Sequence, residues 1–360
     1  MGESKLKRLK REEMLLSCAG VQTMAGRVQM RWATESAATP MGQLAYFIEF
    51  LNLTGLWSRW LEGCPLTYTS PNAPSKADVL GTWMLSVLAG HKRYAHVTTI
   101  RCDGVNPGLL GMNKVVSEDA LRNALKRIPE AEGCAWLEGQ LSASVAALLD
   151  AAWILDTDVT IKVLYGHQEG AVVSYNPKKP GRPSHSYHTY LMAGTREVLG
   201  VEVLAGNEHT AKHSQPGLLK ILDDLPPEKK PKLVRGDSAF GNDPLMRALE
   251  ERKQPYLFKL KLTKNVKRHI GGLFHQTGWT DAGQGWEGKD GTLALTGWET
   301  KRRVVVLRRP LIGEVMMTGE DESQPFLAFV EADRKAGKQI TGYEYAVLVT
   351  STDYEIVSLG

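Results

Sequence analysis

The sequence predicts an α/β protein built on a mixed β-sheet flanked by helices, and three observations lead to this fold class. Residues 152–163 (AWILDTDVTIKV) alternate between an apolar and a partly polar face, as a β-strand does. Further strand-like runs at 195–205, 232–237 and 256–262 are accompanied by segments of helical periodicity. The chain has 360 residues, of which 42% are hydrophobic, which suits two or three folded domains and excludes wholesale disorder.

Composition and charge limit the classes of protein to which the chain could belong. The net charge is only +4, but the basic residues cluster, and local clusters attract a polyanion more than the sum does. The four cysteines, at positions 18, 64, 102 and 134, follow neither a metal-ligand spacing nor a disulfide framework, which fits a reducing cytosol. The longest apolar run, 145–155, is interrupted by Asp150, and the basic N-terminus lacks an apolar signal core. We therefore expect a cytoplasmic protein without a membrane span.

The first 130 residues are expected to form a helical domain. Five of the first eleven residues are lysine or arginine, and they form either a basic arm for a phosphate backbone or a solvated terminus. Beyond Met41 the pattern is helical, and Ser117 suits the N-cap of a helix over Glu118–Ile128. Basic side chains around this helix make residues 1–130 a candidate DNA-binding domain, although solvated charges on an ordinary helical domain would give the same pattern.

Residues 131–263 contain the first elements of the predicted sheet. A helix over 131–150 leads directly into the strand 152–163. A second strand is expected at 170–175, returning as a hairpin, and a third strand at 195–205.

The segment 176–183 has three prolines, which interrupt helices and central strands, so we expect an extended basic loop there. A helix ending near Leu225, the strand 232–237, a helix capped by Asp243 and the strand 256–262 follow. Three strands, a helix, a strand, a helix and a strand is the order of a ribonuclease H-like core. We therefore predict a mixed five-stranded sheet of this kind, flanked by helices.

The remaining residues are expected to complete the sheet around an insertion. Residues 264–342 are rich in Gly, Trp and Thr and contain short alternating runs, which are typical of a β-rich insertion. The insertion has a basic surface that includes Arg302 and Arg303. The last core strand is expected within 343–360, over Tyr345–Thr350.

Two aspartates on the strand 152–163 are the first candidates for chemistry. Asp156 and Asp158 share one face of the strand, and buried carboxylates are costly unless they are paired or bound to a metal. The alternative is an edge strand with a solvated face, on which the two acids have no special role. Asp237 ends a strand that neighbours 152–163 in ribonuclease H-like topology. Asp158 and Asp237 could therefore meet, and their hard oxygen ligands suit Mg²⁺.

Two long segments resemble a known family. They are LDTDVTIKVLYGHQEGAVVSYNPKKPGRPSHSYH (155–188) and VRGDSAFGNDPLMRALEERKQPYLFKLK (234–261). Both are similar to bacterial insertion-sequence transposases of the DDE type, and the resemblance extends from about residue 40 to the end of the chain. Members of this family are cut-and-paste enzymes with a ribonuclease H-like core and a β-strand insertion before the third acid.

The resemblance assigns roles to the aspartates. It implies that Asp158 is the first catalytic acid and Asp237 the second, and that they hold Mg²⁺ or Mn²⁺ for phosphodiester cleavage and strand transfer. Asp156 is the alternative first acid and a further candidate metal ligand. The implied partners are transposon ends and target DNA, bound by a homodimer. The implied location is the bacterial cytoplasm, in association with the nucleoid.

Basic residues near these acids are predicted to contact the DNA. Some lie in the proline-rich loop, some at the end of the strand 256–262 and some in the insertion. Phosphate contacts of this kind set affinity and its dependence on salt rather than the choice of sequence. The alternative is that they are solvated residues with no partner. The predicted DNA-binding residues are Lys178, Lys179, Arg182, Lys259, Lys261, Arg302 and Arg303.

The third acid of the family has no convincing counterpart in this sequence. In the family it lies on a helix after the last strand, within a Y-x2-R-x3-E-x6-K pattern that is missing here; Glu344 and Glu355 are poor substitutes. We therefore expect a transposase truncated before its third acid and impaired in activity. Two alternatives stay open: a non-catalytic fragment that binds DNA ends or inhibits an intact enzyme, and a metabolic or structural α/β protein with an incidental D-x-D.

Overall fold

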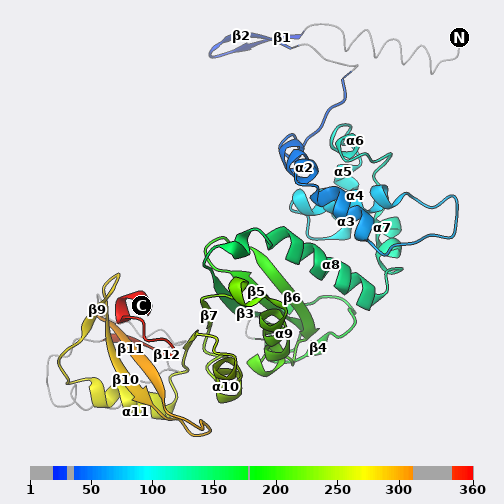
Figure 1. Ribbon diagram of the computed structural model, residues 1–360. Helices are drawn as coiled ribbons and strands as arrows, with labels where there is room; N and C mark the ends of the chain where they lie inside the picture. The colour runs from blue at the N-terminus through cyan, green and yellow to red at the C-terminus, as the bar shows by residue number, and fades with distance from the viewer. Residues whose placement is uncertain (1–18, 31–35, 177–178, 311–342, 360) are drawn as a thin grey trace, which may run out of the picture. The chain divides into compact units, whose positions relative to one another are not determined.

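The chain forms two compact units, Met1–Gln140 and Leu141–Gly360, which are described separately (Figure 1). The structure is a computed structural model that describes residues 19–30, 36–176, 179–310 and 343–359. The division falls inside helix α8 (Glu130–Val145), whereas the sequence placed the end of the N-terminal domain at residue 130. The other predicted domain limits stay predictions.

Unit 1 begins with a β-hairpin and continues as helices. Strand β1 (Ala19–Thr23) pairs antiparallel with β2 (Gly26–Met30), and Gly26 at the turn has a φ of +122°, which favours glycine. The sequence predicted only a basic arm or a solvated terminus before residue 40, because strands this short and polar leave little periodic signal. Among the described residues, the α-helices of unit 1 before α8 are α2 (Leu44–Leu53), α3 (Leu56–Gly63), α4 (Lys76–Leu88), α5 (Val97–Ile100), α6 (Asn106–Leu109) and α7 (Glu118–Leu125).

A cluster of tryptophans fixes helices α3, α4 and α8 against one another. The ring centroid of Trp60 lies 5.9 Å from that of Trp57, 5.6 Å from that of Trp83 and 5.1 Å from that of Trp136. The indole N–H groups of Trp57 and Trp136 donate to the carbonyls of Leu110 at 3.2 Å and of Trp60 at 3.0 Å. Because the polar edge of each ring is satisfied, its large apolar body can be buried at low cost.

Five strands of unit 2 form the core sheet. Strand β5 (Pro183–Met192) is antiparallel to β3 (Ile154–Val163) on one side and to β6 (Val198–Ala205) on the other. Strand β7 (Leu233–Gly236) runs parallel to β3, and β8 (Tyr256–Lys259) runs parallel to β7. The order β6-β5-β3-β7-β8, three antiparallel strands followed by two parallel ones, is the ribonuclease H-like order, so the predicted fold class is confirmed.

The second core strand is β5, not the predicted strand 170–175. In that region only Val172–Val173 forms a strand, β4, which pairs with the start of β5. Along β5 every second side chain is buried, but three of the buried positions hold Ser184, Ser186 and His188. A strand whose buried face is polar has no apolar periodicity, so the sequence pattern did not reveal it.

The insertion extends the core sheet. Strand β12 (Tyr343–Thr350) pairs antiparallel with β8, and β11 (Arg302–Pro310), β10 (Trp286–Leu293) and β9 (Thr280–Gly283) follow in that order. Unit 2 therefore contains one continuous ten-stranded sheet. The predicted β-rich character holds for the described part of the insertion, while residues 311–342 lie outside the described residues.

The two faces of this sheet bury different clusters. One face packs Leu155, Val234 and Phe258 against α9 (Ala211–Asp224), α10 (Asp243–Glu251) and α11 (Lys264–Leu273), with Leu218, Leu245 and Ile270 among the helix side chains in contact. The other face contributes Ile154, Leu233 and Leu257 to a smaller cluster with Ile356 of α13 (Ile356–Leu359). Because side chains alternate along a strand, Asp156 and Asp158 lie on the same face as Ile154. No helix among the described residues has the length and apolar character needed to cross a membrane.

Candidate active site

The predicted acids lie on two neighbouring parallel strands. In the pairing of β3 with β7, Asp156 is opposite Arg235 and Thr157 is opposite Gly236. One residue further along each chain come Asp158 on β3 and Asp237 immediately after β7. The side chains of Asp156 and Arg235 meet on one face, so alternation directs Asp158 and Asp237 to that same face. Adjacent strands are about 4.8 Å apart, so the backbones of these two residues lie close together. That both carboxylates hold a common ion stays a prediction.

Both carboxylates are accessible. Asp158 is exposed, and its Oδ2 accepts a long hydrogen bond of 3.4 Å from the Thr160 hydroxyl. Asp237 is also exposed, and its Oδ1 accepts from the backbone N–H of Ala239 at 2.9 Å, which fixes the turn after β7. Within the described residues no lysine or arginine forms an ion pair with either acid. Their remaining lone pairs are therefore open to a ligand.

Asp156 forms an ion pair, unlike Asp158 on the same strand. Its two carboxylate oxygens accept from Nε and Nη2 of Arg235 at 2.7 and 2.8 Å. The hydrogen bond to Asp156 raises the pKa of the Arg235 guanidinium, and the bidentate geometry is that of a strong, charge-assisted contact. The arrangement favours Asp158 over Asp156 as the first acid, and Asp156 would have to leave Arg235 before it could bind a metal.

The donor set fits part of a magnesium site. Two exposed carboxylates supply hard oxygen ligands, and Mg²⁺ keeps several waters and takes other oxygens from a phosphate. Within the described part of the chain, no group of three His, Cys, Asp or Glu side chains gathers around a common point. Glu344, one of the two weak candidates for a third acid, pairs with Arg309 at 2.6 Å. Asp158 and Asp237 could therefore supply two protein ligands of the ion.

Lys259 follows the two acids in the same row across the sheet. The pairing of β7 with β8 sets Gly236 opposite Phe258, so the next position sets Asp237 beside Lys259. Lys259 and Lys261 are both exposed. Sequence spacing alone could not reveal this row, because the register of three strands decides it.

The basic loop presents its charges over an aromatic ring. Lys179 Nζ and the Arg182 guanidinium each lie 5.4 Å from the ring centroid of Tyr165, and both side chains are exposed. Their predicted contact with DNA stays a prediction, and Lys178 lies outside the described residues.

Arg302 is not available to DNA, which corrects the sequence-based prediction. Its side chain is 3% exposed, and it donates to Asp243 at 2.6 Å and to Glu250 at 2.7 and 3.0 Å. Its guanidinium also lies 5.3 Å from the ring centroid of Trp298. The sequence showed a basic run but not acids more than fifty residues away, so it could not distinguish a structural arginine from a DNA contact.

Arg303 is similarly committed to the fold. Its Nε and Nη2 donate to the two oxygens of Asp290 at 2.7 and 3.0 Å, and its Nη1 donates to the carbonyls of Thr352 and Tyr354. The guanidinium thus ties β11 to β10 and to the segment after β12. This arrangement argues against the predicted contact with DNA.

The family model "Transposase DDE domain group 1" matches residues 73–313. A search of curated proteins gives no match. The region matched by the family model contains both acids and all five strands of the core sheet.

Three solved structures have low similarity to the chain. A piggyBac transposase synaptic complex with hairpin DNA has 11% identity and a TM-score of 0.35; the match covers 90% of this chain and 55% of the piggyBac chain. A Mos1 transposase paired-end complex with the left transposon end has 12% identity and a TM-score of 0.22; the match covers 53% of this chain and 61% of the Mos1 chain. The Mos1 strand transfer complex has 11% identity and a TM-score of 0.20; the match covers 60% of this chain and 70% of the Mos1 chain. The chain thus spans about half the length of the piggyBac transposase, and the fold assignment rests on strand order.

The family match covers well over half of the chain. The matched region contains the strands in ribonuclease H-like order and the two candidate acids, Asp158 and Asp237. The bacterial origin and the truncation expected from the sequence stay predictions. The chain belongs to the transposase DDE domain group 1 family.

Proposed function

We propose that the chain is the DNA transposase of an insertion sequence, which cuts the element at its ends and joins it to target DNA. The observation that supports this most directly is the register of β3 and β7, which sets Asp158 beside Asp237 on one exposed face. Membership of the DDE transposase family supplies the reaction class. Divalent cations held there would stabilise the attacking and leaving oxygens of an in-line phosphodiester displacement.

The residues of this face have separate tasks in the proposal. Asp158 and Asp237 hold Mg²⁺ or Mn²⁺, and Arg235 neutralises Asp156 so that the latter does not compete for the ion. Lys259, next in the row, contacts a phosphate of the bound strand. Lys179, Arg182 and Lys261 extend the positive path along the DNA, whose ends and target are the substrates. We expect the active assembly to be a homodimer on DNA.

Titration of the full chain with Mn²⁺ tests the metal site. Asp158→Ala and Asp237→Ala should each weaken Mn²⁺ binding by well over tenfold, since even the loss of outer-shell partners costs 10–100-fold. Asp224→Ala removes an exposed carboxylate that pairs with Lys220 on α9 and is the matched control. The proposal fails if the two site variants bind Mn²⁺ as tightly as the control does.

A second candidate function follows from the number of acids at the site. Among the described residues no group of three His, Cys, Asp or Glu side chains is gathered, whereas the family resemblance implies three acids. A chain that binds DNA ends without cutting them would act as an inhibitor of a complete transposase. Incubation with end-bearing DNA and Mg²⁺ separates the two: cleavage that Asp237→Asn abolishes supports the enzyme, and salt-dependent binding without cleavage supports the inhibitor.

A further inference from the structure

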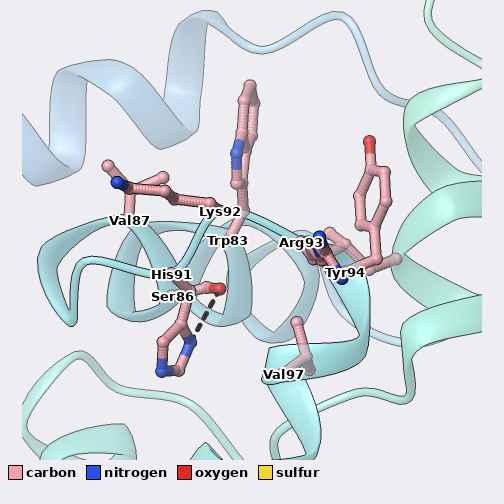
Figure 2. Close-up of a pocket in the computed structure, with 9 residues that line it drawn as sticks. Trp83, Ser86, Val87, His91, Lys92, Arg93, Tyr94 and Val97 are labelled. Atoms are coloured by element: carbon pink, nitrogen blue, oxygen red, sulfur yellow. Dashed lines mark hydrogen bonds between the residues drawn. The ribbon is translucent and has the colours of Figure 1, made fainter. Parts of the chain in front are cut away.

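Unit 1 contains a pocket that has no part in the proposed metal site. It lies where helix α4 ends, with a short 3-10 helix (Tyr94–His96) and α5 on its other side (Figure 2). The cavity has a volume of about 220 Å³. Sites for drug-sized molecules usually measure roughly 300–1,000 Å³, so this pocket suits a single small ring system.

Two aromatic side chains form walls of the pocket. Trp83 is half-buried and is held by the ring of Trp60 at 5.6 Å. Tyr94 is 40% exposed, and the guanidinium of Arg122 lies 5.2 Å from its ring centroid. Arg122 is itself fixed by an ion pair with Glu118 on the same helix. In Figure 2 the rings of Trp83 and Tyr94 extend to the same side of the ribbon, with Arg93 between them. Each ring therefore has a neighbouring side chain against it, Trp60 for Trp83 and Arg122 for Tyr94.

The floor of the pocket is apolar and its rim is positively charged. Val97 and Leu121 are almost fully buried, with exposed fractions of 1% each. Lys92 and Arg93 are exposed at the rim, and none of the described carboxylates forms an ion pair with them. An exposed pair of unneutralised cations beside aromatic walls favours an anionic ligand with an apolar, planar part.

His91 lines the pocket as a neutral polar group. Its ring nitrogens contact the hydroxyls of Ser86 at 3.1 Å and Thr99 at 3.3 Å. Burial, and then the neighbouring His96, lower the pKa of His91 below its ordinary value. The lining residues that carry positive charge near pH 7 are thus Lys92 and Arg93.

We propose that this pocket binds one nucleotide of an unpaired DNA strand. The base stacks against Trp83 and Tyr94, and a neighbouring phosphate lies on Lys92 and Arg93. Aromatic stacking accepts any base, and cations beside it follow the backbone, which is the usual basis of single-strand binding. A base inside a duplex cannot enter without leaving its stack. The inference rests on the proposed function because that function brings DNA to the protein.

Fluorescence anisotropy of labelled oligothymidylate, with the full chain in EDTA, tests the stacking contact. Tyr94→Ala should weaken binding roughly 5- to 150-fold, as expected for one stacked base, while Tyr94→Phe should bind as the wild type does. A blunt duplex of equal length should show no difference between the two variants. If Tyr94→Ala misfolds by circular dichroism, Tyr94→Leu fills the same space without an aromatic face.

A pair of matched double variants tests the rim. Lys92→Gln with Arg93→Gln should make the slope of log K against log salt less steep by about 0.7, which is the contribution of one single-strand phosphate. Lys114→Gln with Lys126→Gln removes the same charge from exposed lysines of unit 1 that do not line the pocket, and should leave the slope unchanged. Equal effects of the two double variants would mean that Lys92 and Arg93 act only through the net charge of unit 1, which would overturn the proposal.

Two further results would overturn the assignment. One is an equal effect of Tyr94→Ala on single-stranded and blunt duplex DNA. The other is complete displacement of the oligonucleotide by an equal nucleotide concentration of dTMP, which would make the pocket a mononucleotide site. Mn²⁺ binding at Asp158 and Asp237 does not involve the pocket. Intact metal binding with a failed pocket test therefore rejects this inference alone, and the reverse result rejects the proposed metal site alone.

Discussion

Two arginines of unit 2 make the same type of contact in opposite surroundings. Arg302 is almost fully buried and joins Asp243 of α10 and Glu250 of the same helix to strand β11. Arg235 forms an equally short pair with Asp156, but its side chain is 45% exposed on the face that carries the predicted acids. The energy of an ion pair depends strongly on whether water can replace the lost partner. The comparison therefore predicts that Arg302 stabilises the fold, whereas Arg235 contributes little stability and restrains Asp156 at the site.

Replacing the buried arginine gives the largest expected effect. Arg302→Met should reduce the free energy of unfolding of unit 2 by about 3–5 kcal/mol, because Asp243 would be left buried without its main partner. Urea denaturation followed by circular dichroism measures the change. A loss below about 1 kcal/mol would mean that Asp243 and Glu250 are solvated after all, and would remove the distinction between the two arginines.

Acid should weaken the buried contact in a defined range of pH. Burial acts to raise the pKa of Asp243 and Glu250, but hydrogen bonds from Arg302 outweigh it and hold both pKa values below their ordinary values. A lowered folded-state pKa contributes stability above the unfolded pKa of about 4, and this contribution is lost as the pH falls through the lowered values. Wild-type stability should therefore fall below about pH 4 more steeply than that of Arg302→Met. Parallel acid-dependence curves would contradict this.

Replacing the exposed arginine should change stability little but metal binding clearly. Arg235→Ala should cost at most about 1 kcal/mol, as exposed pairs do. It releases Asp156 on the same face as Asp158, so Mn²⁺ affinity should rise, on the order of tenfold. The double variant Arg235→Ala with Asp156→Ala is the control and should bind Mn²⁺ as the wild type does. Weaker Mn²⁺ binding by Arg235→Ala would show that the arginine assists the site instead of restraining Asp156.

Much of the fold could be predicted from the sequence because local signals agreed with the tertiary structure. Strand β3 showed a clear alternation, and the predicted cap Ser117 accepts from the backbone N–H of Ala120 at 3.2 Å, as its position before α7 suggested. Strand β5 was missed because its buried positions include serines and a histidine. Ser186 and His188 hydrogen-bond to each other and to the carbonyl of Glu208, and the hydroxyl of Ser184 contacts that of Ser174. This hydrogen bonding is visible only in three dimensions.

The sequence carries more information on the acids of the candidate site than on its basic residues. Asp158 and Asp237 could be chosen as candidates because each lies in a specific motif and at the end of, or within, a recognisable strand, and their role as catalytic acids stays a prediction. The roles of arginines depend on distant partners: Asp156 for Arg235, and Asp243 for Arg302. A basic run in a sequence therefore indicates charge, while the choice between DNA and an internal carboxylate depends on the register of the sheet.

The position of β12 in the chain leaves one edge of β8 unpaired for part of the time during synthesis. This strand completes one side of β8 in the sheet, although it is synthesised 84 residues after β8 ends at Lys259. At ribosomal rates of roughly 5–20 residues per second, the edge of β8 stays open for about 4 to 17 seconds or more during synthesis. An unpaired strand edge can recruit a strand from another chain. Aggregation during expression should therefore depend on translation speed across the insertion more than on the stability of the finished sheet.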